Sequence, residues 1–250
     1  MTGATSGIGH AVAVAFGARG ARVGIVGRDP SRAASCADAV RETGGVADIL
    51  PLDLMDPDAT KAALGAFAKE SGGLVCAVNA AGVDIETPVL EASFADYEKV
   101  FGVNVRGLLA CMQAEIAALR TAGGGAIVNI TSIAARRETP LNSLYNASKA
   151  AASMLTRCAA LEEGPNGIRI NELAPGPVDT PMLDHYFEKA RASGIDTGLD
   201  AIAAVNPLRK VGSPAEIAEA AVFLCSRQAS YITGACLTAD GGLSLGLRVG

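Results

Sequence analysis

Short apolar runs alternate with longer, Ala-rich segments along most of the chain. The Ala-rich segments have the length and composition of helices, whereas the short runs are apolar on both faces and predict buried strands. Strands that are apolar on both sides must be covered on both sides, so the alternation predicts an α/β fold, a doubly wound parallel sheet with helices on each face. The six predicted strands are Val23–Val26, Val46–Leu50, Leu74–Val78, Ala126–Ile130, Ile168–Leu173 and Ala235–Thr238.

Segment 180–212 contains no strand-like run and is typical of helical structure. It precedes a helix start, Ser213-Pro214-Ala215-Glu216, in which Ser caps the helix, Pro fits its first turn and Glu completes a capping box. At 250 residues, half of them hydrophobic, the chain has enough apolar material for one α/β domain. We therefore expect a single domain over 1–250, with 180–212 as a lid.

Composition and charge exclude several other classes of protein. The apolar runs never approach the roughly 18 residues that a membrane span requires. The opening residues, MTGATSGIGH, contain neither a basic nor an apolar signal-peptide region, so we expect a cytoplasmic protein that does not bind membranes. A net charge of −5 with scattered basic residues offers no surface for a phosphate backbone, so no nucleic-acid partner is expected.

The cysteines and histidines do not form a metal site. The six cysteines show no C-x-x-C pair and mostly stand in apolar runs such as LVCAV, so we expect reduced, buried thiols and no zinc. No His/Cys/Asp cluster has metal-ligand spacing. We assign no catalytic role to His10, which directly follows a glycine motif, or to His185, which lies in the predicted lid.

A glycine-rich motif precedes the first predicted helix, His10 to Arg19. Its sequence, TGATSGIG, spaces the glycines as G-x-x-x-G-x-G. Glycines allow the backbone to approach an anion closely, and a helix N-terminus supplies free N–H groups and a positive dipole, so the motif suits a diphosphate. The alternative is an ordinary Gly-rich turn between strand and helix. The candidate phosphate-binding residues are Gly3, Ser6, Gly7, Ile8 and Gly9.

The motif resembles the cofactor loop of the short-chain dehydrogenase/reductase family, and the resemblance continues through nearly the whole chain. Within the family, Asn206-Pro207-Leu208-Arg209 and Thr233-Gly234 resemble 3-oxoacyl-carrier-protein reductases and many sugar or secondary-alcohol dehydrogenases alike. The matching positions follow in the family's order: Asp53-Leu54, Asn79-Ala80-Ala81-Gly82, Asn104 in VNVRG, Ser132, Tyr145, Lys149, Pro175-Gly176 and Asp240-Gly241-Gly242.

The resemblance implies a Rossmann-type sheet, a homotetramer and a set of cofactor contacts. Asp53 and Leu54 would lie near the adenine, and the loop of Asn79, Ala80 and Gly82 beside the ribose. The residues expected to flank the nicotinamide are Pro175, Gly176, Val178 and Thr180. Asp240-Gly241-Gly242 also has the composition of a simple turn, and we favour that reading.

Tyr145 and Lys149 are four residues apart in a predicted helix, so both side chains project from one face. A free phenol has a pKa of about 10, and its ionisation near neutrality needs about 4 kcal/mol of stabilisation. A nearby ammonium and a cofactor's positive ring have the sign to lower that pKa. Tyr145 would then donate a proton to a carbonyl oxygen in reduction and recover it in oxidation. Taken alone, the pair could equally be a half-buried Tyr beside a solvated Lys.

Ser132 and Asn104 complete the candidate catalytic set. Ser132 follows the apolar run AIVNI, where its hydroxyl could orient the substrate oxygen. Asn104 lies inside a helical stretch, an unfavourable place for an amide unless it holds a water molecule or kinks the helix. The resemblance implies that Asn104 extends a proton relay through Lys149 to solvent. Arg136 and Arg137 could meet an anionic substrate, but exposed loop arginines are the commoner explanation.

The end of the second predicted strand favours NADP over NAD. An acidic residue at this position binds the ribose 2′-OH of NAD, whereas an arginine accommodates the 2′-phosphate of NADP. The chain has Gly27-Arg28 here, and Asp29-Pro30 reads as a helix cap followed by Pro in the first turn. Ser6 stands where many NADP-binding relatives carry a basic residue.

These features predict a single dinucleotide-binding and catalytic domain over 1–250, with 180–212 as substrate lid. The predicted reaction is hydride transfer between NADP(H) and a small ketone or secondary alcohol, with a 3-oxoacyl thioester as one candidate. The competing hypothesis is a binding module that senses NADP without turnover. Loss of a catalytic residue would favour that module, and the sequence retains all four of Asn104, Ser132, Tyr145 and Lys149.

Only Met1 precedes Thr2, although the family's first strand normally runs into this Thr-Gly pair. In the sheet order 3-2-1-4-5-6 that strand is central, so its absence would leave both neighbours with unpaired backbone groups. We therefore expect a sheet without its first strand, and we hypothesise that the true chain begins several residues earlier. The alternative is that the remaining strands close the gap around a damaged cofactor site.

Overall fold

A computed structural model describes residues 1–245. All six predicted strands are present, with ends displaced by up to two residues from the predicted ones. Their apolar side chains are buried; Ile25, Ile127 and Leu173, for example, are fully enclosed. The strands are β1 (Arg22–Gly27), β2 (Val46–Pro51), β3 (Cys76–Asn79), β4 (Gly125–Ile130), β5 (Ile168–Pro175) and β6 (Cys236–Ala239).

All strand pairs are parallel, as predicted. β1 pairs with β2, while β3, β4, β5 and β6 follow one another in that order. The carboxyl ends of the strands therefore lie along one edge of the sheet, where loops from distant parts of the sequence meet.

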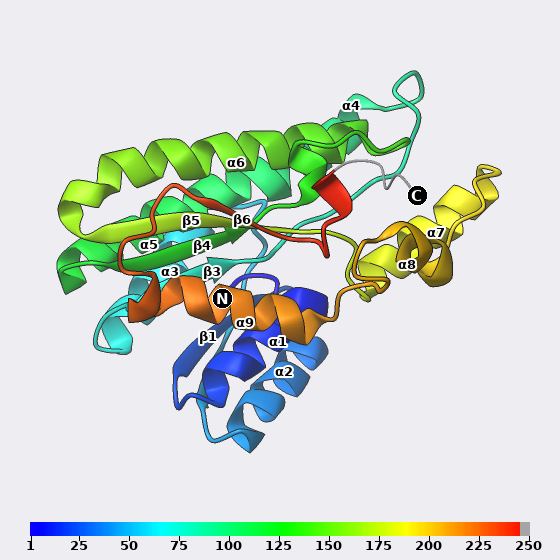
Figure 1. Ribbon diagram of the computed structural model, residues 1–250. Coiled ribbons are helices and arrows are strands. Elements are labelled where there is room, and N and C mark those ends of the chain that lie inside the picture. Colours follow the sequence, from blue (N-terminus) through cyan, green and yellow to red (C-terminus); the bar gives the residue numbers. More distant parts are fainter. Residues whose placement is uncertain (246–250) are drawn as a thin grey trace.

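Helices cover both faces of the sheet (Figure 1). One face carries α1 (Gly7–Gly17), α2 (Pro30–Glu42) and α9 (Pro214–Cys225), whose apolar residues pack against the sheet. The other carries α3 (Pro57–Glu70), α5 (Leu108–Ala122) and α6 (Ser143–Glu163). Short α4 (Phe94–Phe101) continues through the π-helix Gly102–Gly107 into α5. The doubly wound α/β architecture is thus confirmed.

Local helix-start signals behave as the sequence predicts. The Asp29 side chain caps α2 by accepting a hydrogen bond from the backbone N–H of Arg32 at 3.1 Å, with Pro30 at the first helical position. Ser213 and Glu216 form a capping box at the start of α9. Each device satisfies backbone donors that the helix itself leaves free.

The centre of the sheet is held by a single residue. Thr2 forms parallel bridges to Val26 of β1 and to Asn79 of β3, and no longer strand lies between these two within residues 1–245. The Met1 ammonium donates to the carbonyl of Gly24 at 2.9 Å. Beneath Met1, a cavity of about 90 Å³ separates β1 from β3. Within residues 1–245, Thr2 alone joins β1 to β3, and these two strands do not pair with each other.

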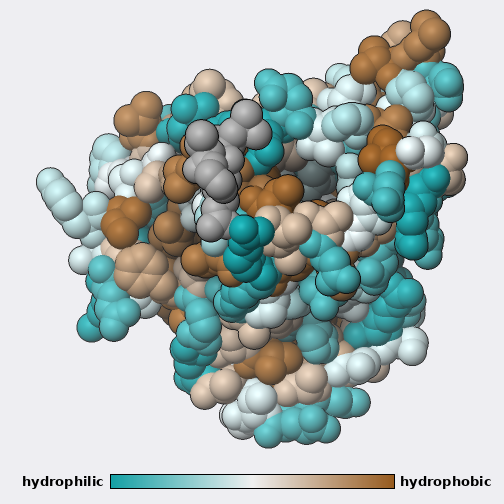
Figure 2. All heavy atoms as spheres, turned by 45° about the vertical axis from the view of Figure 1, so that its right-hand side comes forward, coloured by the Kyte–Doolittle hydropathy of each residue, from teal (hydrophilic) through white to brown (hydrophobic). Residues whose placement is uncertain are grey.

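Segment 180–212 is helical, as predicted. It forms α7 (Pro181–Ala192) and α8 (Leu199–Val205), which extend beyond the carboxyl edge of the sheet on the right of Figure 1. Figure 2 turns this side forward and shows hydrophobic and hydrophilic residues interspersed over it. The segment therefore lies beside the carboxyl ends of the strands.

The cysteines only partly match the expectation of buried thiols. All six are free; Cys36 and Cys111 are buried, but Cys158 is exposed on α6, so the expectation is wrong there. The Ala-rich surroundings of Cys158 do not distinguish the buried from the exposed face of a helix. Along residues 1–245, no helix combines the length and hydrophobicity needed to cross a membrane.

Candidate active site

A cleft of about 660 Å³ opens at the carboxyl edge of the sheet. It brings together every predicted site residue except Asn79 and Asn104, although they come from seven separate segments of the chain. The predicted residues that line it are Gly3, Ser6, Gly7, Ile8, Gly9, Arg28, Asp53, Leu54, Ala80, Gly82, Ser132, Tyr145, Lys149, Pro175, Gly176, Val178 and Thr180.

The glycine motif forms a backbone cradle at the start of α1. Gly3 has a positive φ of 67°, and a Cβ there would stand 2.6 Å from the backbone nitrogen of Ala81. A Cβ on Gly9 would overlap the carbonyl of Gly3, so the loop folds tightly upon itself and upon the next loop. The Ser6 side chain does not cap α1, which leaves N–H groups of the first turn available to an anion. These features fit the diphosphate of a dinucleotide.

Arg28 is the basic residue that follows β1 in the cleft. Its side chain is 65% exposed, and one guanidinium nitrogen lies 3.9 Å from the Asp53 carboxylate. Asp29 is already engaged as the cap of α2. The guanidinium of Arg28 therefore remains accessible to a ligand, whereas the carboxylate of Asp29 serves the helix.

Tyr145 and Lys149 lie on one face of α6, as their spacing predicts. The ammonium of Lys149 is 5.5 Å from the centre of the Tyr145 ring and donates to the Ile130 carbonyl at 3.0 Å. Lys149 is 5% exposed, and burial lowers its pKa to about 8. Ser132 stands at the end of β4, where its hydroxyl accepts a hydrogen bond from Ala134 N–H and starts the 3-10 turn Ile133–Ala135.

The electrostatics around Tyr145 differ from the expectation of a lowered pKa. Burial, followed by the negative charge of Asp84, raises the pKa of the phenol, while the Ser132 hydroxyl acts in the opposite direction. Burial of the phenol and the nearby Asp84 carboxylate therefore outweigh the Ser132 hydroxyl. The protein by itself keeps this phenol protonated.

Asn104 and Asn79 lie behind the cleft. Asn104 sits in the π-helix, where its side-chain oxygen accepts from Val83 N–H and its amide nitrogen donates to Val83 C=O, both at 2.8 Å. This fastening explains an amide within a helix and matches the kink interpretation. Asn79 donates to Glu115 at 2.8 Å and to Asn129 at 3.0 Å.

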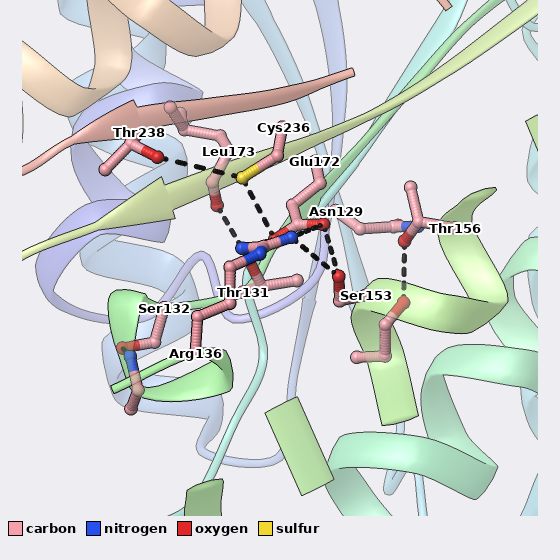
Figure 3. Close-up of polar contacts among 12 residues, drawn as sticks. Asn129, Thr131, Ser132, Arg136, Ser153, Thr156, Glu172, Leu173, Cys236 and Thr238 are labelled. Atoms are coloured by element: carbon pink, nitrogen blue, oxygen red, sulfur yellow. Dashed lines mark hydrogen bonds and ion pairs between the residues drawn. The ribbon is translucent and has the colours of Figure 1, made fainter. Parts of the chain in front are cut away.

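An ion pair between exposed Arg136 and buried Glu172 supports the turn that follows Ser132, and the sequence analysis did not predict it. Glu172 of β5 is fully buried, and Arg136 contacts its two oxygens at 2.7 and 3.0 Å. Figure 3 shows Thr131, Ser153 and Cys236 converging on the same carboxylate. Burial alone would raise the pKa of Glu172, but these hydrogen bonds, Arg136 first, lower it below its usual range.

Arg136 is an exposed turn residue, as expected, and its guanidinium in addition contacts the buried Glu172 carboxylate. A glutamate within the otherwise apolar run INELAP was the available signal, because a buried carboxylate needs a cationic or hydrogen-bonding partner. Arg137 also lies exposed and donates to the Leu243 carbonyl. Asp240 accepts from the backbone N–H groups of Gly242 and Ser244, which agrees with the turn interpretation.

Asp84, whose charge acts on Tyr145, and its neighbour Glu86 form an acidic pair that the sequence analysis did not single out. Asp84 lines the cleft and accepts a hydrogen bond from the Asn142 amide at 2.7 Å. Burial and then the charge of Glu86 raise the pKa of Asp84 to about 7. One Glu86 oxygen lies 3.7 Å from His185 Nε2 of α7. Two carboxylates in a variable loop after a strand give no pattern that sequence analysis could recognise.

Comparison with known proteins agrees with this geometry. The protein-family model described as enoyl-(acyl carrier protein) reductase matches residues 3–244. Galactitol 2-dehydrogenase (L-tagatose-forming) of Cereibacter sphaeroides is 38% identical over 248 residues, which cover 98% of this chain and 94% of the relative.

Two solved structures superimpose on nearly the whole chain. A 7α-hydroxysteroid dehydrogenase complexed with NADH and 7-oxoglycochenodeoxycholic acid gives a TM-score of 0.87 at 32% identity, covering 99% of this chain and 94% of that one. ElxO with NADP bound gives 0.87 at 29% identity, covering 98% and 97%. The chain belongs to the short-chain dehydrogenase/reductase family and is an oxidoreductase of the Rossmann type, which confirms the resemblance inferred from the motifs.

We predict that Arg136→Met lowers the free energy of unfolding by about 1–3 kcal/mol, because it leaves the buried Glu172 carboxylate without its cation. Adding Glu172→Gln should recover much of the loss. Denaturant unfolding measures both effects. The neighbouring Arg137→Met is the control and should change stability by less than about 0.5 kcal/mol. Equal losses for the two arginine variants would contradict the assigned role.

The raised pKa of Asp84 predicts a particular dependence of stability on pH. An unfolded aspartate releases its proton near pH 4, whereas native Asp84 keeps it until about pH 7. The native state binds more protons in this window, so the contribution of Asp84 to stability falls as pH rises through it. Asp84→Asn, which carries no charge, should therefore gain in melting temperature relative to wild type from pH 5 to pH 8. A difference that stays constant or shrinks would refute the buried-charge interpretation.

Proposed function

We propose that this chain transfers a hydride between NADP(H) and a small ketone or secondary alcohol. The observation that carries the proposal is the convergence of Ser132, Tyr145 and Lys149 in one cleft, next to a glycine cradle at a helix N-terminus. A proton donor, a buried ammonium and an orienting hydroxyl beside a dinucleotide site are the groups that carbonyl reduction requires. Because the catalytic set is complete, a purely sensing module is not favoured.

Ser132, Tyr145 and Lys149 would have separate roles in the reaction. Ser132 orients the substrate oxygen toward the Tyr145 hydroxyl. Tyr145, protonated at neutral pH, donates its proton to that oxygen in reduction and accepts it in oxidation. Lys149 stabilises the phenolate that remains and is itself held by the Ile130 carbonyl. When bound, the nicotinamide cofactor supplies or accepts the hydride.

The cofactor-binding residues would follow the predicted arrangement. The cradle would hold the diphosphate, Asp53 and Leu54 the adenine, the loop after β3 the ribose, and the segment Pro175–Thr180 the nicotinamide. Asn104 would support this loop through Val83, and Asn79 would fix its start. The accessible guanidinium of Arg28 supports NADP over NAD. The solved relatives include one complex with each cofactor, so family membership does not decide between them.

The proposal names a class of substrate, small ketones and secondary alcohols, and not one compound. The relative from Cereibacter sphaeroides is named for galactitol, and a solved relative holds a steroid ketone. A 3-oxoacyl thioester stays within the proposal as one candidate. We further propose that residues 1–250 act as one domain in a cytoplasmic homotetramer, with 180–212 closing over the substrate.

Tyr145→Phe should bind NADPH within a few fold of wild type but lose nearly all turnover. The ring remains while the acid is removed, and general acid catalysis contributes typically 10²–10⁴-fold. Turnover is measured by cofactor absorbance over a panel of ketones and secondary alcohols, and affinity by equilibrium titration. Retention of more than about a tenth of wild-type turnover would exclude Tyr145 as proton donor.

Arg28→Ala should weaken NADPH binding more than NADH binding, because only NADPH carries the phosphate that the guanidinium can contact. The ratio of the two dissociation constants should fall toward one. Arg41→Ala, also on the α2 side but paired with Asp38, serves as the control and should leave the ratio unchanged. Similar losses for both cofactors in Arg28→Ala would remove the argument for NADP.

A further inference from the structure

Several buried acceptor oxygens near Tyr145 receive no hydrogen bond from residues 1–245. They are Asp84 Oδ1, Glu86 Oε1, Asn142 Oδ1 and Asn146 Oδ1. The Glu86 side chain is only 2% exposed and Asn142 only 6%. A buried acceptor without a donor is costly and uncommon in native proteins, so a cluster of them calls for an explanation.

Two of the four residues belong to the cleft, whereas Glu86 and Asn146 lie outside its lining. Asp84 and Asn142 both line the cleft, as does Tyr145. Asn142 immediately precedes α6, and its amide is already fixed by donating to Asp84. The two segments are joined by a hydrogen bond from Thr87 N–H to the Leu141 carbonyl at 2.8 Å. The side chains of Asp84 and Asn142 are thus held in place in the wall of the cleft that Tyr145 also lines.

The charges around this cluster restrict what could satisfy it. Asp84 and Glu86 disfavour an anionic ligand. The buried ammonium of Lys149, whose charge acts on Asp84, disfavours a cationic one. A neutral hydrogen-bond donor is repelled by neither the carboxylates nor the ammonium. In a substrate that is itself a secondary alcohol, a second hydroxyl group is such a donor.

We infer that Asp84 and Asn142 form a subsite for a second hydroxyl of the substrate, next to the carbon that reacts at Tyr145. The substrate class is then a neutral diol or polyol, or the corresponding hydroxyketone. Glu86 lies next to the subsite. Its charge acts on Asp84, and one of its oxygens is 3.7 Å from His185 Nε2 of α7. The inference rests on the proposed function for the identity of the reacting group, but the binding of a second hydroxyl can be measured separately.

The test compares cis-1,2-cyclohexanediol with cyclohexanol, which share a ring and differ by one hydroxyl. Wild type should oxidise the diol with NADP⁺ at a kcat/KM at least tenfold above that for cyclohexanol. Asp84→Leu, which removes both oxygens at similar volume, should reduce this ratio at least tenfold, mainly through KM for the diol. Glu138→Gln neutralises an exposed carboxylate on the same cleft and should keep the ratio.

Each contrary outcome has a separate meaning. A wild-type ratio near one, or a ratio unchanged in Asp84→Leu, would overturn the subsite while leaving hydride transfer intact. Preference for trans-2-aminocyclohexanol or for 2-hydroxycyclohexanecarboxylate over the diol would overturn its assignment to a neutral ligand. If the melting temperature shows that Asp84→Leu does not fold, Asp84→Asn replaces it and should give a smaller loss in the same direction.

The proposed function can fail independently. No turnover of any alcohol or ketone with either cofactor would refute hydride transfer. Calorimetric titration of the diol would still test the subsite: wild type should bind it more tightly than Asp84→Leu by at least tenfold. Equal affinities, or no binding by wild type at the highest soluble diol concentration, would overturn the inference.

Discussion

The common direction of the strands is the constraint on which the rest of the structure depends. Because every pair is parallel, the segments after β1, β3, β4 and β5 all leave the sheet at one edge. Arg28, Ser132 and Pro175 meet there although they are far apart in the chain. The helices contribute at the same edge: α1 begins there with free N–H groups, and α6 presents Tyr145 and Lys149. The cleft is therefore a consequence of topology, and its chemistry of the residues that the topology assembles.

Two buried carboxylates show how differently one fold can treat the same group. Glu172 is surrounded by Arg136 and three further donors, so its charge is compensated within the protein. That arrangement suits a structural role, and it anchors the turn that follows Ser132. Asp84 has one donor from Asn142 and a like charge nearby, and burial raises its pKa to about 7. An acceptor left unsatisfied beside the proposed substrate site is a group available for recognition.

Much of the fold could be predicted because its signals are local. Apolar runs predicted the six strands. Asp29 and Ser213 predicted helix starts, because each side chain accepts a hydrogen bond from the backbone N–H three residues later. The missed features depend on contacts between distant positions. Arg136 and Glu172 are 36 residues apart, and Asp84 and Asn142 are 58 apart. The exposed position of Cys158 was missed for a related reason, since helical spacing in an Ala-rich segment does not show which face is covered.

The sequence by itself determined the α/β class, the family and the identity of the candidate catalytic residues, because periodicity, capping and ordered motifs are written in neighbouring residues. Only the tertiary structure decided the protonation tendency of Tyr145, the fastening of Asn104 to Val83 and the single-residue bridge at Thr2. It also decided which carboxylates are compensated. These properties depend on burial and on the charges of groups distant in the chain, and no local pattern encodes either.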